Sequence, residues 1–347
     1  MATSGFTSWF LNSKEKHQNT HIDYSTSASQ LWSIAKAYFQ DKREFATPKK
    51  AIPVKPVTAD ALVAGTDDMV MRWGHSTVLL RLDGNLILLD PVFSERASPF
   101  GWAGPKRFHD MPISLEQLPA IKAVVISHDH YDHLDKASVR ALNDKVDVFL
   151  TPSGVGERLI KWGVSADKVQ QFGWWESVEV NNIIFTATPS QHFSGRGLFD
   201  RDQTLWAGWA IQSQSRKVFF SGDSGYFPGF KEIGNRLGPF DMTLMETGAY
   251  NELWSDIHML PEQSLQAHID VRGGVMVPIH NGSFDLALHD WFEPLVKIQA
   301  LADAHDIDLA TPIFGEAIAF DSPQPAKQWW VEQPDATLAA NQLQPQL

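Results

Sequence analysis

The sequence predicts an α/β protein whose functional site lies at one edge of a β-sheet. Short apolar runs typical of buried strands, such as 121–126 and 275–279, alternate with stretches that have helical spacing or helix caps. Ligands of open sheets bind outside the carboxyl ends of the strands, so side chains from distant parts of the chain can meet there. The metal-binding side chains that follow apolar runs are His128, His130, His192, Asp223 and His280.

The amino-acid composition indicates a globular protein and excludes some classes of partner and metal ligand. Hydrophobic residues make up 43% and charged residues 20% of the 347 residues, which is typical of a globular chain with material for one large domain or two ordinary ones. The formal net charge of −12 argues against nucleic acid or anionic lipid as a partner held by bulk electrostatics, because their phosphates would repel an acidic protein, and it leaves a local positive site open. The chain has no cysteine, so any metal ligands must come from its 13 histidines and its carboxylates.

The predicted location of the protein rests on two sequence features, the secretory signal and the membrane span, neither of which is recognised. Apolar pieces within residues 1–11 are too short for a secretory signal, and no basic residue precedes them. No apolar run approaches the roughly 18 residues of a membrane span. These features predict a cytoplasmic protein and leave peripheral membrane contact open.

The chain is expected to consist of an extension, a main domain and a tail. Residues 1–67 are predicted to be an N-terminal extension and linker, in which Ser29 to Gln40 has the spacing of an amphipathic helix. Residues 68–320 are predicted to form the main domain. Residues 321–347, rich in Pro and Gln, are predicted to be a loosely attached tail apart from Trp329-Trp330.

Regular structure is expected to begin near residue 69. Residues 70–82 and 85–89 are predicted to be two strands joined at Asp83-Gly84, a pair common in hairpin turns. The irregular segment 94–118 is expected to border a cleft. The later expected strands are 121–126, 146–150, 178–180, 183–187, 204–211, 217–220, 242–246 and 275–279, and the expected helices are 136–143, 153–162 and 262–270.

The stretch from His128 to His133 carries the strongest functional signal. Residues two apart on an extended backbone face the same way, so His128 and His130 can bind one metal ion together. Asp132 and His133 are neighbours whose side chains must diverge, which suits a second ion nearby. Imidazole and carboxylate are ligands of Zn²⁺ and similar cations. The alternative is a histidine-rich surface loop, but the position directly after an apolar strand favours a metal site.

A family resemblance extends beyond this stretch. The strings that carry it are Arg72–Leu79, Asp90–Pro99, Gly104–Phe108, Ser127–Asp135, Trp174–Glu176, Thr188–His192, Gly222–Tyr226, Gly238–Asp241 and Gly248–Tyr250. On these strings the chain resembles the metallo-β-lactamase-fold hydrolases, and within them the N-acylphosphatidylethanolamine-hydrolysing phospholipase D group. The match covers roughly residues 69–320, and it implies a four-layer αββα metallo-β-lactamase sandwich with a dinuclear metal site. One departure is Asn281, where the family has a tryptophan.

The resemblance, joined to the pairing of ligands, implies one assignment for two divalent ions. The first ion is expected on His128, His130 and His192, the second on Asp132, His133 and His280, with Asp223 as the bridge. Zn²⁺ fits this ligand set best, and Fe or Mn also fit it. Taken alone, the aspartate of a Gly-Asp-Ser-Gly string is more often a turn former, and only the family order favours metal binding.

Other residues receive roles from the same resemblance. His75 and Asp90 are expected to orient ligands or stabilise turns rather than to bind metal. His258 matches a family position near the scissile phosphate, so His258 and Asp132 are the expected catalytic residues; an ordinary loop histidine is the alternative for His258. Most of the 13 tryptophans are expected in the core. The aromatic residues predicted to line an acyl groove are Trp102, Tyr250 and Trp254.

The resemblance implies a zinc-dependent phosphodiesterase of the phospholipase D type. It would hydrolyse N-acylphosphatidylethanolamine or a related glycerophosphodiester through a metal-bridging hydroxide, so the expected partner is a small-molecule or lipid phosphodiester. Two divalent ions outweigh two carboxylates and one hydroxide, and this local positive charge suits an anionic substrate. The alternatives are a lactonase or other C–O hydrolase acting on a small anionic substrate, and a non-catalytic metal-binding protein. The sequence also allows a homo-oligomer.

Overall fold

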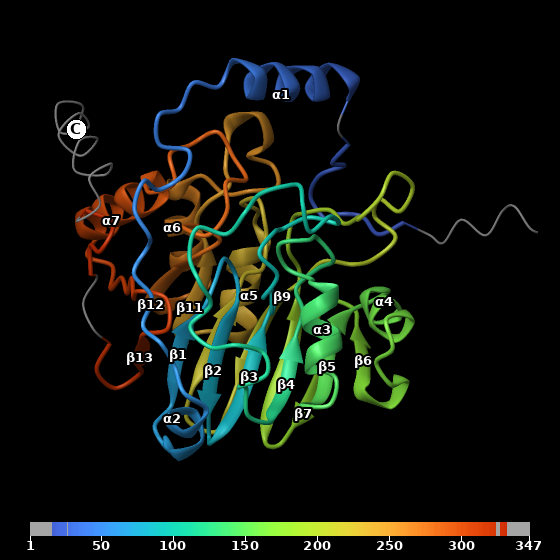
Figure 1. The fold of residues 1–347 in the computed structure, drawn as a ribbon, viewed down its shortest axis with the longest axis vertical. Coiled ribbons are helices and arrows are strands. Elements are labelled where there is room, and N and C mark those ends of the chain that lie inside the picture. Colours follow the sequence, from blue (N-terminus) through green and yellow to red (C-terminus); the bar gives the residue numbers. More distant parts are fainter. Residues whose placement is uncertain (1–15, 26, 324–326, 332–347) are drawn as a thin grey trace, which may run out of the picture.

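Two β-sheets packed face to face form the centre of the protein. The computed structural model describes residues 16–25, 27–323 and 327–331. Within these residues helices cover the outer face of each sheet, giving the layers helix, sheet, sheet, helix (Figure 1). The predicted four-layer αββα fold is therefore confirmed. No helix of the described residues has the length and apolar character to cross a bilayer.

The first sheet has the strand order β13-β1-β2-β3-β4-β5-β6. Its strands are β1 (Met69–Arg72), β2 (Val78–Leu82), β3 (Asn85–Leu89), β4 (Ile121–Val125), β5 (Val146–Pro152), β6 (Val169–Phe172) and β13 (Ala317–Ala319). The strand predicted over 70–82 is wrong as a single element, because residues 73–77 leave the ladder. The Trp73 amide donates to the Thr77 carbonyl at 2.8 Å and closes a loop that carries His75 toward the site.

The second sheet has the order β12-β11-β10-β9-β8-β7. Its strands are β7 (Ser177–Val180), β8 (Ile183–Thr188), β9 (Gly208–Gln212), β10 (Lys217–Phe220), β11 (Phe240–Glu246) and β12 (Gly273–Ile279). The strand predicted to start at residue 204 begins at Gly208 instead. The amides of Leu205 and Ala207 donate to Ser153 and Ser127 in other loops, so they are not available to the ladder.

Side chains that alternate along each strand pack into different layers of the fold. Phe220 of β10 faces the apolar core between the sheets with Trp209 and Ile211, whereas its neighbour Phe219 faces the helices. Each such buried side chain stabilises the fold by roughly 1.5–3 kcal/mol. The helices of the described residues are α1 (Ala28–Gln40), α2 (Ala59–Ala64), α3 (Lys136–Leu142), α4 (Val155–Lys161), α5 (Gly229–Leu237), α6 (Pro261–Asp270) and α7 (Glu293–His305), with short turns η1 (Ala166–Lys168) and η2 (Glu252–Trp254).

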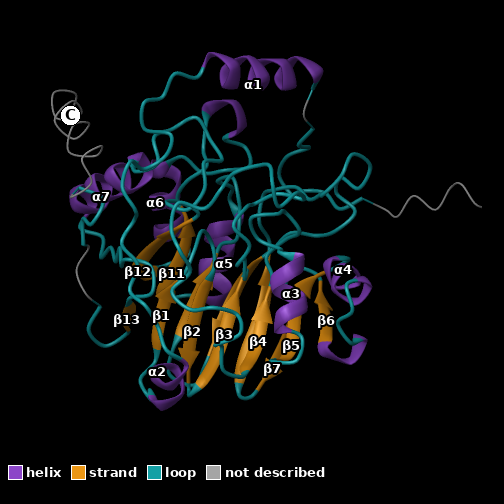
Figure 2. Cartoon of the chain, in the orientation of Figure 1, coloured by secondary structure: helices purple, strands orange, loops and turns teal. Residues whose placement is uncertain are grey.

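The outer helices divide between the two sheets. Side chains of α3 and α4, including Val139 and Leu159, are buried with the outer face of the first sheet. Side chains of α5, α6 and α7, including Phe230 and Leu265, are buried with the outer face of the second. The loops that connect these elements gather at one end of the strands, which is the end that holds the predicted site (Figure 2).

The N-terminal segment lies across this loop end. Helix α1, predicted over 29–40, is present there, and Ser27 caps it by accepting from the Gln30 amide at 3.1 Å (Figure 1). The Tyr38 hydroxyl donates to the Leu286 carbonyl at 3.0 Å. At the other end of the chain Trp329 and Trp330 are buried among aromatic residues. The rest of the predicted tail from 332 lies outside the described residues.

Candidate metal centre

The structure brings the seven predicted metal ligands together at the loop end of the sheets. They lie just beyond β4, β8, β10 and β12, as the rule for open sheets predicts. His280 has a left-handed backbone, with φ of 65°. A histidine in this conformation is strained, and such strain is concentrated at functional sites.

The first group of donors consists of His128, His130, His192 and Asp223. The His128 Nε2 and His130 Nδ1 atoms lie 2.9 Å apart, and His192 Nε2 lies 3.2 Å from the same Nδ1. Asp223 Oδ2 is 3.7 Å from His128 Nε2 and 3.8 Å from His192 Nε2. Donors placed tetrahedrally around Zn²⁺ at 2.0–2.1 Å are roughly 3.4 Å apart, so this spacing fits one ion.

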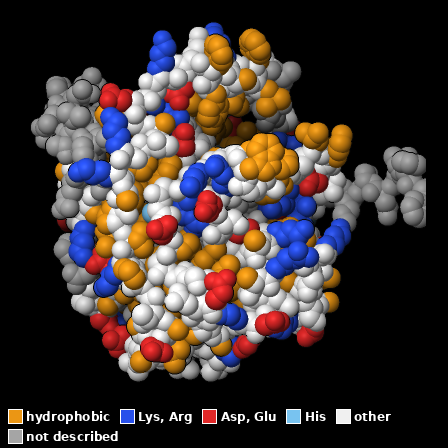
Figure 3. Space-filling view, in the orientation of Figure 1, with side chains coloured by type: hydrophobic (Ala, Val, Ile, Leu, Met, Phe, Trp, Pro, Cys, Tyr) orange, Lys and Arg blue, Asp and Glu red, His pale blue; other side chains and the backbone are white. Residues whose placement is uncertain are grey.

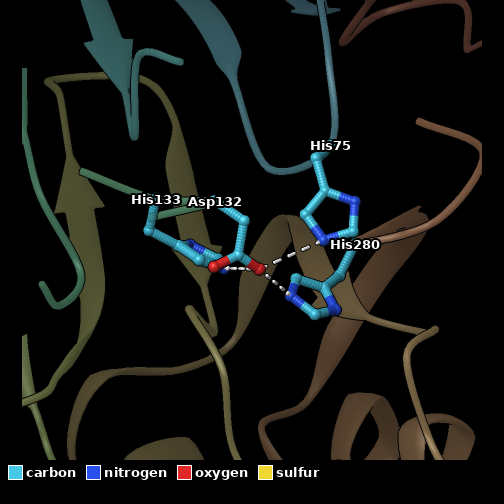
Figure 4. A group of neighbouring side chains, drawn as sticks. All are labelled: His75, Asp132, His133 and His280. Atoms are coloured by element: carbon cyan, nitrogen blue, oxygen red, sulfur yellow. Dashed lines mark hydrogen bonds and ion pairs between the residues drawn. The ribbon is translucent and has the colours of Figure 1, made fainter. Parts of the chain in front are cut away.

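The second group consists of His75, Asp132, His133 and His280 (Figure 4). Asp132 Oδ2 lies 3.3 Å from His280 Nε2 and 3.5 Å from His133 Nε2. Asp223 faces this group as well, with Oδ1 3.0 Å from His133 Nε2 and Oδ2 3.1 Å from His280 Nε2. Asp223 is therefore the one carboxylate placed between the two groups.

The predicted orienting residue His75 lies closer to the donors than expected. Its Nε2 atom is 3.5 Å from Asp132 Oδ2, and its ring centroid is 3.9 Å from that of His280. The ring is buried, and neither of its nitrogens has a hydrogen-bond partner in the described residues. His75 can thus serve as a ligand of the second group or as a neighbour that fixes it.

Hydrogen bonds to the far side of each ring determine which nitrogen faces the centre. His133 Nδ1 lies 2.6 Å from Asp90 Oδ2, so its Nε2 is left for the site. His192 Nδ1 donates to the Ile257 carbonyl at 3.0 Å with the same result. Asp90 also accepts from the Ser127 amide at 2.7 Å, which holds it at the end of β3. Such partners outside the coordination sphere orient ligands and raise their basicity.

The electrostatics around His133 and His280 in the second group favour positive charge. Burial opposes ionisation of Asp132 and Asp223, but the adjacent His133 and His280 hold both carboxyl pKa values well below their usual range. In return, although burial acts to lower the pKa of His280, Asp223 and Asp132 raise it to about 10. Metal ions compete with protons for these ring nitrogens, so a site that raises their pKa is one that attracts cations.

The donor set fits divalent metal ions. His133 Nε2 and Asp223 Oδ1 are buried and lie 3.0 Å apart without the geometry of a hydrogen bond. Buried polar atoms are normally paired, and a divalent ion bound by both atoms would satisfy them. A set of imidazoles and carboxylates without thiolate suits Zn²⁺, Fe or Mn.

A third group contains a residue that the sequence interpretation missed. Glu246 is fully buried at the end of β11 and contacts His258 Nδ1. The His258 ring lies 5.0 Å from His192 and 5.3 Å from His280 by centroid, so this predicted catalytic residue borders both donor groups. The pattern that indicated the ligands could also have indicated Glu246, because this residue too stands at the end of an apolar strand.

The aromatic residues predicted to line an acyl groove lie in different surroundings. Trp254 is buried, and its indole nitrogen donates to the Ala249 carbonyl at 2.8 Å. Tyr250 is buried with its hydroxyl 3.0 Å from Glu293 Oε1. Trp102 is 80% exposed and contacts Phe100 with ring centroids 5.5 Å apart. Their part in substrate binding stays a prediction.

A cavity beside the first donor group has a wall made by the N-terminal segment. It measures about 790 Å³, and residues 16–25 line it together with His192, Arg201 and Trp206. The Asn19 side chain donates to the His192 carbonyl at 2.8 Å and accepts from its amide at 3.0 Å. The segment ahead of the main domain is therefore in contact with a predicted ligand.

Asn281, the departure from the family pattern, has a structural role. Its side-chain amide donates to the carbonyls of Thr247 and Ile279 at 3.0 Å each. Its Oδ1 accepts from Arg72 at 2.9 Å. The residue is buried, and it ties the loop after β12 to β1 and β11.

Comparisons with known proteins agree with this geometry. A family model described as the beta-lactamase superfamily domain matches residues 85–281. An uncharacterised protein of Mycobacterium tuberculosis is 42% identical over 81% of this chain and 77% of its own length. The N-acyl-phosphatidylethanolamine-hydrolyzing phospholipase D 1 of Caenorhabditis elegans is 37% identical over 74% of this chain and 75% of its own length.

A solved structure shows the same fold. A metallo hydrolase from the archaeon Ignicoccus hospitalis superposes with a TM-score of 0.56 at 22% sequence identity. The match covers 73% of this chain and 98% of that one. At this identity the likeness supports the fold alone.

Proposed function

The chain belongs to the metallo-β-lactamase-fold hydrolases, and from this premise we propose that it is a dinuclear metal-dependent phosphodiesterase. The observation that carries the proposal is the position of Asp223. Its Oδ1 lies 3.0 Å from His133 of the second group, and its Oδ2 lies between His280 of the second group at 3.1 Å and His128 of the first at 3.7 Å. One carboxylate between two groups of imidazoles suits a pair of ions a few ångströms apart.

The residues divide into two coordination sets around this bridge. His128, His130 and His192 would hold one ion, while Asp132, His133 and His280 would hold the other. Bound divalent ions would supply a nucleophilic water of lowered pKa and neutralise charge on a phosphoryl oxygen. Asp132 thus acts in the reaction as a ligand, and we propose zinc as the metal.

His258 is the residue placed to handle the leaving group. Its Nδ1 contacts Glu246, so its Nε2 is the nitrogen left to meet a substrate. Glu246 also accepts from the Ser224 amide at 2.7 Å, and this second contact fixes the carboxylate. A histidine held in this way can donate a proton to the departing oxygen, a contribution typically worth 10²–10⁴ in rate.

The proposed substrate is a glycerophosphodiester of the N-acylphosphatidylethanolamine type. The Caenorhabditis elegans relative, 37% identical, has this activity in its name. A phosphodiester is anionic, which matches a centre whose two divalent ions outweigh its carboxylates. Such a substrate resides in a bilayer, so the proposal includes peripheral contact with a membrane.

Purified protein assayed against two substrate panels tests this function. After metal quantification, N-acylphosphatidylethanolamine and related phosphodiesters should be hydrolysed with about two metal equivalents per chain. Asp223→Ala should lose at least about 10³-fold in turnover, since it removes the bridge. Asp241→Ala, an exposed carboxylate of β11, is the matched control and should keep full activity.

Three results would contradict the proposal. Turnover of lactones with none of phosphodiesters would assign the site to a C–O hydrolase of the same family. Full metal content without turnover of either panel would favour a non-catalytic metal-binding protein. A single metal equivalent at full phosphodiesterase activity would remove the dinuclear assignment.

A further inference from the structure

A second groove lies beside the metal centre, on the outer side of the loop that carries the ligands. It measures about 740 Å³ and runs from the segment after β3 to the start of α3. Tyr131, which stands between two predicted ligands in the chain, forms part of its wall. None of the roles assigned above uses this groove.

Cationic side chains dominate the lining of the groove. They are Arg96, Lys136, Arg140, Arg158 and Arg196. The lining carboxylates are Glu95, which pairs with Lys106 at 3.7 Å, and Asp135, which accepts from the Ser94 hydroxyl at 2.7 Å and caps α3. The chain as a whole has a net charge of −12, so this local excess of positive charge is unusual. Such a groove would attract an anionic ligand.

Most of these cations have no counter-ion in the described part of the chain. Arg158 pairs with Asp129 at 2.7 Å and Asp200 at 2.9 Å, and it is the exception among the five. Arg140 Nε donates to the Trp162 carbonyl at 2.9 Å, and Lys136 Nζ lies 6.0 Å from the centre of the Trp162 ring. Neutral groups make the direct contacts to these cations, so most of them lack an ion pair, and Asp129 and Asp135 act on Arg196 from a greater distance.

Arg196 shows this most clearly, because it is partly buried. Its guanidinium donates to the carbonyls of Asp129 and Leu134 at 2.6 and 2.7 Å and lies 3.8 Å from the Tyr131 ring centre. A carboxylate partner within ion-pair distance is absent from the described residues. Keeping a cation out of water without an anion is costly, so an anionic ligand would stabilise this arrangement.

Exposed apolar side chains lie in the groove and in the loop that follows its lining residue Arg196. Phe100 lines it at 54% exposure, and Leu198 and Phe199, in the loop between Arg196 and Asp200, are each 90% exposed. Large hydrophobic side chains this exposed are unusual unless they contact another surface. On the face shown in Figure 3, Lys and Arg side chains gather close to exposed hydrophobic ones.

Helix α1 also carries exposed apolar side chains. Trp32 and Phe39, seven positions apart and so on one face of the helix, are 72% and 92% exposed. The helix lies over the loop end of the sheets, the end at which the ligand-bearing loops also lie (Figure 1). Of the exposed large hydrophobic residues elsewhere, Val63 lies on α2 at the opposite end of the sheets.

From this combination of a cationic groove with few ion pairs and exposed apolar side chains in and after it, we propose that the groove binds the headgroup of an anionic phospholipid in a bilayer. The apolar side chains enter the interface, while the cations meet the lipid phosphate, as in other interfacial proteins. The proposal deepens the proposed function, on which it rests for the lipid substrate, by naming the surface that presents that substrate. The phosphate it binds is distinct from the one hydrolysed.

Vesicle cosedimentation of the full chain tests the proposal without any turnover. Wild type should bind vesicles of phosphatidylcholine with about 30% phosphatidylglycerol at least tenfold more tightly than pure phosphatidylcholine at low salt. About 1 M salt should remove the preference, because it screens charges beyond about 3 Å. This binding can fail while hydrolysis of a detergent-dispersed phosphodiester persists, and the reverse holds too, so the two proposals are separable.

Matched variants locate the contact. Lys136→Glu should weaken binding to the anionic vesicles at least about fivefold, the effect of roughly 1 kcal/mol per surface cation. Lys231→Glu, the same change at an exposed position of α5, should weaken it less than twofold. Leu198→Ser with Phe199→Ser should reduce binding to both vesicle types, whereas Val63→Ser should not.

Several results would overturn the proposal. Equal binding to neutral and anionic vesicles would remove the headgroup site, and so would equal losses in Lys136→Glu and Lys231→Glu. If glycerol phosphate protects the wild type against thermal unfolding while vesicles are not bound, the groove is a site for a soluble phosphate ester instead. The milder Lys136→Gln decides the question if the charge reversal does not fold.

Discussion

His133 Nδ1 lies 2.6 Å from Asp90 Oδ2, and both side chains are fully buried. The carboxylate therefore fixes the ring so that Nε2 faces Asp223. Asp90 directly follows β3 and His133 lies in the loop after β4, and these are neighbouring parallel strands. The pairing of the two strands therefore determines where the His133 ring lies in the metal centre.

We expect Asp90→Asn to weaken metal binding by 10- to 100-fold, the usual cost of removing such a partner. The amide keeps the shape and can still accept from His133, but the negative charge that raises the basicity of the ring is lost. Competition with a chromogenic chelator measures the affinity. Asp241→Asn removes the same charge from an exposed position of β11 and should leave the affinity unchanged.

Glu246 should matter through His258 rather than through metal content. We expect His258→Ala to reduce kcat by 10²–10⁴-fold with metal stoichiometry unchanged, because a proton donor is removed. Glu246→Gln should produce a smaller loss and shift the pH–rate profile, since it changes the group that contacts His258 Nδ1. Normal kcat in His258→Ala would show that His258 is an ordinary loop histidine without a role in proton transfer.

The ligands from His128 to His133 could be predicted from the residues themselves, because they cluster directly after one apolar strand. His192, Asp223 and His280 stand alone after their strands, so only the family resemblance selected them. Glu246 also ends an apolar strand but belongs to none of the family strings, and only the packing of β11 against β10 shows its position. The contact between Asn19 and His192 joins residues 173 positions apart, and no local periodicity encodes it. The groove beside α3 depends on Arg196, whose charge is visible in the sequence but whose burial is not.

Removal of the metal should destabilise the fold. Without ions, buried carboxylates such as Asp223 face only imidazoles, and the donors lose their common partner. Titration of chelated protein with zinc should raise the free energy of unfolding by about 2.7 kcal/mol when free zinc is about 100 times Kd. Magnesium, which prefers oxygen ligands, serves as the control cation. Equal stabilisation by both ions would argue against an imidazole-rich site.

The N-terminal segment should affect the site through Asn19. Asn19→Ala removes the hydrogen bonds to the backbone of His192 and the acceptor 3.0 Å from the Trp206 indole nitrogen. At a net value of about 1 kcal/mol for a hydrogen bond, we expect kcat/KM to fall about five- to tenfold. Asn143→Ala, at the end of α3, is the matched control. An unchanged kcat/KM would mean that the segment only covers the cavity.

His109 predicts how stability responds to acid. Its ring is buried against Phe314 at a centroid distance of 3.7 Å, and burial lowers its pKa to about 3. The cations Arg107 and Arg72 also oppose its protonation. Between pH 6.5 and 3 the unfolded chain binds a proton that the folded chain refuses, so this residue makes stability fall as the pH falls.

We expect His109 to account for about 2 kcal/mol of the stability that the protein loses between pH 7 and 5, at 1.36 kcal/mol per pKa unit. His109→Phe keeps a ring against Phe314 but cannot titrate. Its free energy of unfolding should therefore fall by about 2 kcal/mol less than that of wild type over this range, whatever its value at pH 7. Urea unfolding of metal-free protein at several pH values measures both slopes. Parallel slopes would show that the folded protein can protonate His109 after all.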